Sequence, residues 1–252
     1  MPEAEKTTAM VLRVVDFSES SSVVTLFTSD FGKISGLAKG ARKPKGSFES
    51  ALDLLSLVRV VFLRKSSGTL DLLTEAKLER RFRPGGNELT RLYSGYYVAE
   101  LLNELTHDHD PHPELFELAE RTLWELSRAG ENPAAIVLRF ELGLLHETGH
   151  LPALTTCAEC GADVLATPRV TFGILDGGSL CGNCRVGKRQ LVSVRREVLL
   201  TLQEFAEHTA EQPVPMLPTE RLGELRGLMN QYLVNLLGTR PRLHEFLHHV
   251  TH

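Results

Sequence analysis

The pattern of apolar and polar residues changes character near residue 83. Between Thr8 and Phe82, short apolar and β-branched runs are separated by Gly, Ser and Asp, a pattern typical of β-strands joined by turns. Apolar and polar residues partly alternate from Leu70 to Leu78, as expected of a strand with one face in solvent. The runs expected to form strands are Met10–Val15, Val23–Thr28, Lys33–Ala38, Leu54–Leu63 and Leu70–Leu78.

Five strands in about 75 residues predict a small closed barrel, because closing a sheet removes its unpaired edges. A five-stranded Greek-key barrel of this size is the oligonucleotide-binding, or OB, fold. An SH3-like barrel is an alternative that the pattern leaves open. We therefore predict an OB-fold, nucleic-acid-binding domain over residues 1–83.

After the punctuating stretch Arg83-Pro84-Gly85-Gly86, apolar residues recur with the period of an α-helix. Asn132 before Pro133 is a helix N-cap followed by proline at the first helical position. Single helices bury too little surface to be stable alone. We therefore expect the helices of residues 84–150 to be completed by those of residues 191–252 in one helical domain, giving an α+β multidomain protein.

Between residues 151 and 190 the helical pattern lapses and all four cysteines of the chain occur as two Cys-x-x-Cys pairs. Two residues between paired thiolates form a tight knuckle that directs both sulfurs to one ion, and two knuckles complete a tetrahedron. Four thiolates fill the coordination shell, so we expect one structural Zn²⁺ in an inserted zinc-finger element. Gly161 and Gly182 are expected to supply positive φ. The predicted ligands are Cys157, Cys160, Cys181 and Cys184.

The cysteines have alternative interpretations. Four unrelated buried thiols are one, and two redox motifs are another, although thioredoxin-like motifs need a βαβ context that is missing. Zinc deaminases place Cys-x-Glu before Pro-Cys-x-x-Cys, and Cys157-Ala-Glu159 precedes Cys181-Gly-Asn-Cys184. Residue 180 is Leu instead of Pro, and Cys160 would occupy the position of the activated water.

The net charge of −4 hides an uneven distribution. Residues 1–83 carry 14 basic and 10 acidic residues, whereas the rest of the chain carries 14 basic and 22 acidic residues. One Gly- and Pro-containing stretch has five basic residues and no acidic one, a composition that suits a phosphate backbone and equally suits a solvated loop. Its basic residues are Lys33, Lys39, Arg42, Lys43 and Lys45.

Other polar clusters favour a structural interpretation. His107, His109 and His112 lie in a connection between helical stripes without a known metal-ligand spacing. Tyr93, Tyr96 and Tyr97 are spaced to pack a helix, although tyrosines can also stack on bases. We find no P-loop, Rossmann or nucleophile-elbow motif and expect no enzyme. The absence of a secretory signal and of a long apolar run favours a cytoplasmic protein.

Several stretches together resemble the RecO family of bacterial recombination mediators, and the resemblance covers nearly the whole chain. Phe172 and Gly173 contribute to it, as do Gly149 and Leu154. The longer stretches are Asp30-Phe-Gly-Lys33, Leu37-Ala-Lys-Gly-Ala-Arg-Lys-Pro-Lys45, Phe140-Glu-Leu-Gly-Leu-Leu145, Gly178-Ser-Leu-Cys181 and Leu237-Gly-Thr-Arg-Pro-Arg-Leu243.

The resemblance implies a nucleoid-associated DNA-repair mediator with an OB fold, a helical domain and a zinc finger. It implies binding of single- and double-stranded DNA, annealing of complementary strands, contacts with RecR and the single-strand-binding protein, and assistance to RecA loading. DNA contact falls on Lys39, Arg42, Lys43 and Lys45, with Lys33 as a weaker member, and the four cysteines hold the metal. An OB-fold RNA-binding protein and a protein-interaction scaffold are the rival functions.

The resemblance also implies that the acidic tail of the single-strand-binding protein docks in the helical domain. Residues 84–252 are acidic on balance, so a local basic spot must overcome that charge. Arg121, Arg139 and Arg226 are candidates for such a spot.

Overall fold

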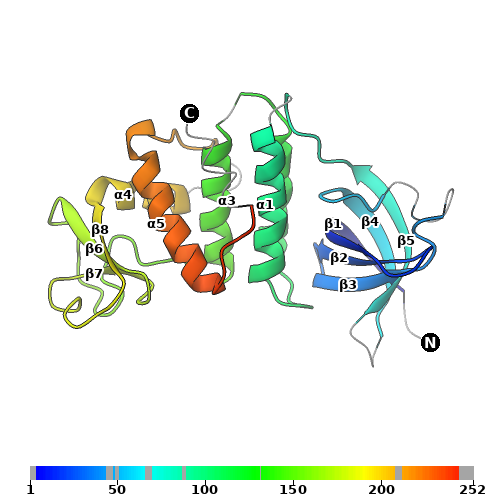
Figure 1. Cartoon of the computed structure of the whole chain (residues 1–252), viewed down its shortest axis with the longest axis horizontal. Coiled ribbons are helices and arrows are strands. Elements are labelled where there is room, and N and C mark those ends of the chain that lie inside the picture. The colour runs from blue at the N-terminus through cyan, green and yellow to red at the C-terminus, as the bar shows by residue number, and fades with distance from the viewer. Residues whose placement is uncertain are drawn as a thin grey trace. The chain divides into compact units, whose positions relative to one another are not determined.

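A computed structural model of the chain describes residues 4–43, 48, 51–65, 70–86, 89–130, 132–207 and 212–243. It divides into two compact units, residues 1–130 and 131–252 (Figure 1). The division falls between the second and third helices, inside the helical region predicted for residues 84–150. None of the described helices is both long enough and apolar enough to cross a membrane.

The first unit contains a closed five-stranded barrel. Its strands are β1 (Ala4–Asp16), β2 (Ser22–Thr28), β3 (Gly32–Ala38), β4 (Leu57–Leu63) and β5 (Asp71–Arg80), in the spatial order β1-β2-β3-β5-β4. All neighbouring pairs are antiparallel except β3 with β5, which is parallel. This Greek-key order confirms the predicted OB fold and excludes the SH3-like alternative.

The first strand is longer than predicted because it pairs on both edges. Residues Ala4–Met10 pair with β4, and the part from Ala9 onward pairs with β2. A register shift between Val11 and Arg13 bends the strand where it changes partners. The fourth strand begins at Leu57 instead of Leu54, since Leu55 has a φ of 63° in the preceding turn.

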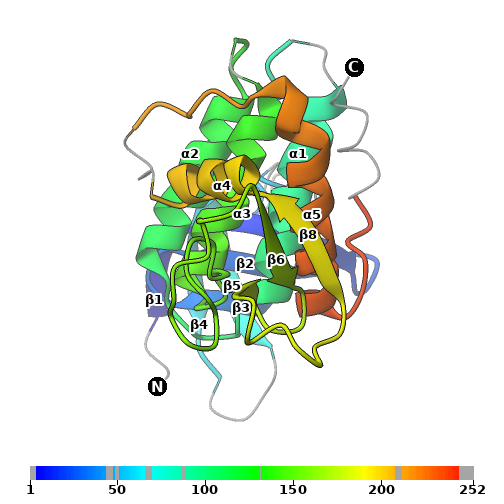
Figure 2. The ribbon, with the colours of Figure 1, turned by 90° about the vertical axis from the view of Figure 1, so that its left-hand side faces the viewer.

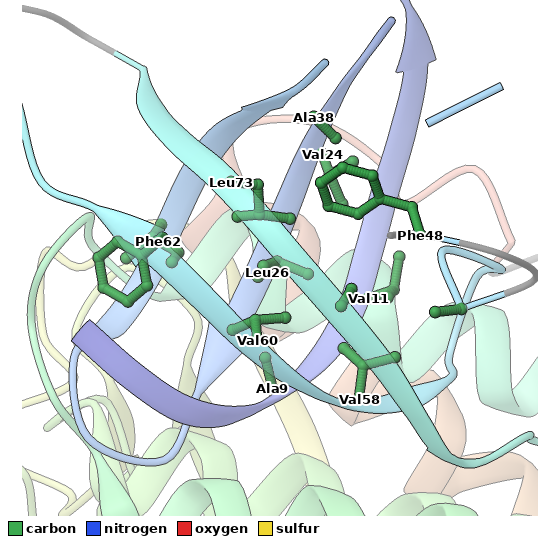
Figure 3. Close-up of a cluster of buried hydrophobic side chains, with 13 residues drawn as sticks. Ala9, Val11, Val24, Leu26, Ala38, Phe48, Val58, Val60, Phe62 and Leu73 are labelled. Atoms are coloured by element: carbon green, nitrogen blue, oxygen red, sulfur yellow. The ribbon is translucent and has the colours of Figure 1, made fainter. Parts of the chain in front are cut away.

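The barrel interior is filled by side chains from all five strands (Figure 3). Phe48 joins them from the β3–β4 connection and is itself buried. Gly36 leaves room for a neighbouring side chain, because a Cβ there would lie 2.7 Å from Cδ1 of Leu73, which would have to shift. The fully buried residues include Val24, Leu26, Ile34, Val58, Val60 and Phe62.

Helices α1 (Leu89–Leu105) and α2 (Pro113–Leu126) complete the first unit. They contact each other, and α1 contacts β1. The ring of Phe116 on α2 lies 6.0 Å from that of Phe27, which projects from the outer face of β2. Tyr97 on α1 is fully buried, while Tyr93 and Tyr96 are half-buried. These tyrosines therefore pack the helix.

The second unit contains helices α3 (Pro133–Glu147), α4 (Arg196–Glu207) and α5 (Thr219–Leu237) and a small sheet. The sheet order is β7-β6-β8, formed by β6 (Arg169–Gly173), β7 (Gly178–Leu180) and β8 (Leu191–Arg195). The chain passes directly from β8 into α4, and both α4 and α5 contact β8 (Figure 2). The side chain of Asn132 accepts a hydrogen bond from Ala134 N, which confirms the predicted N-cap.

Two arginines of the second unit are part of its interior. Arg226 donates two hydrogen bonds to the carboxylate of Glu141, at 2.5 and 2.9 Å, and a third to Asn230. Arg139 is only 1% exposed and donates to the carbonyl of Gln212. Buried arginines held in this way serve the fold and offer no surface charge to an acidic partner.

Candidate functional site

The two Cys-x-x-Cys pairs meet in the second unit. Their four sulfurs lie within 4.8 Å of one another, and Sγ of Cys160 is 3.8 Å from Sγ of Cys181. A tetrahedron with zinc–sulfur bonds of about 2.3 Å has edges of about 3.8 Å. The donor set and its spacing therefore fit one tetrahedral thiolate-bound ion. Among the described residues, no other group of three or more His, Cys, Asp or Glu side chains is close enough to share a metal.

Backbone turns hold both knuckles in place. Gly161 has a φ of 71°, and its N–H donates to the carbonyl of Cys157 at 2.9 Å. The N–H groups of Cys181 and Cys184 point at sulfurs, those of Cys157 and Cys181 respectively. The expectation for Gly182 was wrong, since only Gly161 of the two glycines has positive φ. The second knuckle closes without a left-handed residue at that position.

The electrostatics of the cluster call for a cation. Burial of Cys157 disfavours its thiolate, but the N–H groups of Cys160, Cys181 and Glu159 lower its pKa to about 6. Hydrogen bonds to neighbouring sulfurs, that of Cys181 first, raise the pKa of Cys184. Four thiols this close cannot all ionise against one another's charge. A divalent ion removes that repulsion and stabilises all four thiolates.

The surroundings of the cluster tie it to the small sheet. Ala158 N donates to Ser179 O at 2.8 Å, which links the first knuckle to β7. Lys188, four residues after the last cysteine, bridges the carboxylates of Glu159 and Asp176, the latter at 2.7 Å. Hydrogen bonds to these two carboxylates, that of Asp176 first, raise the pKa of Lys188. The two cysteine pairs are thus joined to each other and to the sheet by backbone hydrogen bonds and by charge.

The basic loop, which we define as residues 39–43, begins where β3 ends. It packs against the β1–β2 turn: Arg42 N donates to Ser20 O at 3.2 Å, and its guanidinium donates to Ser18 O. The same guanidinium lies 3.1 Å from the carboxylate of Asp16. Lys39, Arg42 and Lys43 are all exposed. Lys45 lies outside the described residues.

Lys33 does not join the basic loop. Its ammonium donates to the carbonyls of Asn103 at 2.6 Å and Thr106 at 2.7 Å, at the C-terminal end of α1. Burial lowers the pKa of Lys33, while nearby carboxylates, that of Asp108 first, oppose the shift. A cation at a helix C-terminus satisfies carbonyls that the helix leaves unpaired. Lys33 is therefore occupied in holding β3 to α1.

No sequence pattern selects Phe17, yet the structure places it beside the basic loop. Phe17 is 64% exposed and lies between Asp16 and Ser18, the two residues that contact the Arg42 side chain. A single phenylalanine in a polar turn does not by itself predict a role in binding. Only the pairing of Arg42 with this turn shows that an exposed ring adjoins the basic residues.

Two models of one known protein family match the chain. The family model described as Recombination protein O N terminal matches residues 1–82, and the model described as Recombination protein O C terminal matches residues 86–244. The chain belongs to the RecO family. The first model covers the barrel, and the second covers the cysteine cluster and all helices that the structure describes.

Relatives of this RecO-family chain are similar over nearly their full length. The DNA repair protein RecO of Rhodopirellula baltica is 40% identical, over 95% of this chain and 97% of the relative. That of Anaeromyxobacter dehalogenans is 38% identical, over 96% and 95% respectively. That of Halalkalibacterium halodurans is 29% identical, over 96% and 93%.

Proposed function

We propose that this protein is a DNA-repair mediator without catalytic activity of its own, acting on single- and double-stranded DNA. Membership in the RecO family and relatives named DNA repair protein RecO support the proposal. The observation that carries it is the basic loop on the OB barrel, with Lys39, Arg42 and Lys43 all exposed. DNA binding of this kind brings the protein to the nucleoid.

The proposed action is annealing of complementary strands. Two strands repel each other through their phosphates, and cations that neutralise both on one surface reduce that repulsion and release counterions. Holding both strands on one protein also raises their effective concentration. Base pairing then supplies the driving force, so no bond needs to be made or broken by the protein. This is why a barrel and a basic loop suffice without a catalytic residue.

We also propose that the four cysteines hold one structural Zn²⁺. Four sulfur donors leave no open position for water or substrate, so the ion would fix the fold of residues 151–190 instead of activating a reactant. X-ray absorption on the purified protein should show one zinc per chain with four sulfur neighbours. A first shell with an oxygen in place of a sulfur would reopen a catalytic role.

We propose that the protein helps to load RecA and that its partners in this step are RecR and the acidic tail of the single-strand-binding protein. The tail would not be held by Arg139 or Arg226, because both are buried. Arg121 is also engaged, by Glu125 one helical turn away at 3.0 Å. A tail-binding surface therefore has to come from other residues of the chain.

A strand-annealing assay tests the proposal most directly. Complementary oligonucleotides coated with the single-strand-binding protein of the same organism should anneal faster with this protein than without it. The Arg42→Ala/Lys43→Ala variant should lose most of the acceleration. Competition by matched DNA and RNA strands at fixed salt should favour DNA. A wild-type protein that does not accelerate annealing, or that prefers RNA, would overturn the proposal.

A further inference from the structure

The outer face of the barrel is covered at one end and open at the other. Phe27 and Lys33 pair across β2 and β3 at one end, where Phe116 and the C-terminus of α1 cover them. Four residues away along both strands, at the open end, Val23 pairs with Leu37 on the same outer face, because side chains on one face of a strand recur every second residue. The basic loop follows β3 at this open end.

The open end carries a continuous row of apolar side chains. Val15 of β1 is directly opposite Val23 of β2, Val23 is opposite Leu37 of β3, and Leu37 is opposite Leu72 of β5. Val15 is 43% exposed and the other three are half-buried. Three interstrand spacings make this row about 14 Å long. An apolar ladder on the outside of a barrel has no use in the barrel's own core.

Phe17 lies in the turn that follows β1, at the Val15 end of the row and beside the basic loop. It follows Val15 by two residues and is 64% exposed, more than any other phenylalanine or tryptophan that the structure describes. Arg42 contacts the residues on both sides of it, Asp16 and Ser18. The next outer row inward is polar and contains the exposed Arg13, which is opposite Thr25. Arg13 therefore borders the apolar row on one side, and Arg42, paired with Asp16, lies at its Phe17 end.

From this arrangement we infer that Phe17 and the row formed by Val15, Val23 and Leu37 bind unpaired bases of single-stranded DNA, with one base stacked on the ring of Phe17. The inference rests on the proposed function, since the phosphates are assigned to the basic loop. Nucleobases present flat apolar faces on a chain of phosphates, which matches an apolar row with cations beside it. A protein partner with a purely apolar segment would not use the flanking positive charge.

The consequence is a division of labour between the two surfaces. The basic loop holds phosphates, which single strands and duplexes both offer. Phe17 can stack only on a base that is not already stacked and paired within a duplex. The ring therefore determines preference for single strands, whereas Arg42 and Lys43 determine total affinity. Stacking of one base on an aromatic side chain corresponds to a change of about 5- to 100-fold in affinity.

Fluorescence anisotropy with a labelled oligothymidylate, the matched duplex and an abasic strand of equal length tests the inference. Phe17→Ala should weaken binding of the single strand by about 5- to 100-fold and leave the duplex and the abasic strand within twofold of wild type. Leu89→Ala removes an equally exposed apolar side chain, also 64% exposed, from α1 of the same unit and serves as the matched control. It should change none of the three affinities.

A second measurement reads the ring itself. The chain has a single tryptophan, Trp124, so Phe17→Trp in a Trp124→Phe background carries its only indole at the proposed platform. Oligothymidylate should quench that fluorescence, and the abasic strand should not. Equal loss of binding to all three ligands, or no quenching, would overturn the stacking role. If Arg42→Ala/Lys43→Ala retained full affinity for every ligand, the proposed phosphate site would fail independently of the result for Phe17.

Discussion

The salt dependence of DNA binding gives the sharpest test of the basic loop. Each phosphate neutralised on a single strand contributes about 0.7 to the slope of log affinity against log salt. Removing two cations with Arg42→Ala/Lys43→Ala should therefore reduce the slope by about 1.4. Because the carboxylate of Asp16 lies 3.1 Å from Arg42 and already offsets part of its charge, this is an upper value. Between 50 and 200 mM salt, wild-type affinity should fall by up to about sevenfold more than that of the variant.

The assay is anisotropy of a labelled oligothymidylate at four or five salt concentrations. Lys6→Ala/Lys77→Ala is the control, because it removes the same charge from two exposed lysines of β1 and β5 outside the loop. The control should keep the wild-type slope, since net charge alone acts only weakly beyond a Debye length of about 8 Å. Equal slopes for wild type and the loop variant, or equal reduction in both variants, would refute the assignment of phosphates to this loop.

Three further outcomes follow from the structure. Cys157→Ser should release zinc and lower the melting temperature measured by differential scanning fluorimetry, with a metal assay to follow the zinc. A strong chelator should lower the melting temperature of the wild type by the same amount and leave that of the variant unchanged. An unchanged melting temperature in Cys157→Ser would make the metal dispensable for folding. Glu141→Gln should lower the free energy of unfolding in urea by about 3–5 kcal/mol, because it leaves Arg226 buried without its counter-charge. The double variant Glu141→Gln/Arg226→Met should recover part of that stability, whereas a decrease below about 1 kcal/mol in the single variant would show that water already solvates the pair. Asp16→Asn should strengthen binding of single strands at low salt and steepen the salt slope, since it frees the guanidinium of Arg42 for phosphate; weaker binding would mean that Asp16 instead orients Arg42 for DNA.

Features that depend on neighbouring residues were predicted well. Strand alternation and turn residues located all five barrel strands, and closure followed from their number. The N-cap at Asn132 depends on one side chain and the N–H two residues later, so it was also predictable. The cysteine cluster needs only two local knuckles and a connection long enough to bring them together. In each case the local preference and the final structure agree.

Features that depend on distant pairing were not predicted. The stretch Ala4–Ala9 has few large apolar residues, and it becomes a strand because β4 pairs with it. Lys33 is close in sequence to the basic loop, but carbonyls some seventy residues later hold its ammonium. Phe17 gains its neighbours only through the register of β1 with β2 and the contact of the turn with Arg42. Periodicity contains no information about any of these contacts.

The double pairing of β1 has a consequence for how the protein is made. One edge of β1 finds β2 almost immediately, whereas its other edge waits for β4, about fifty residues later in the chain. The barrel also needs β5 between β3 and β4, and β5 ends at Arg80. During synthesis, a nascent chain that ends before β5 therefore presents an open ribbon of at most four strands, β4-β1-β2-β3, with unpaired edges. The first unit of the protein should therefore depend on chaperones or on fast elongation until Arg80 has left the ribosome.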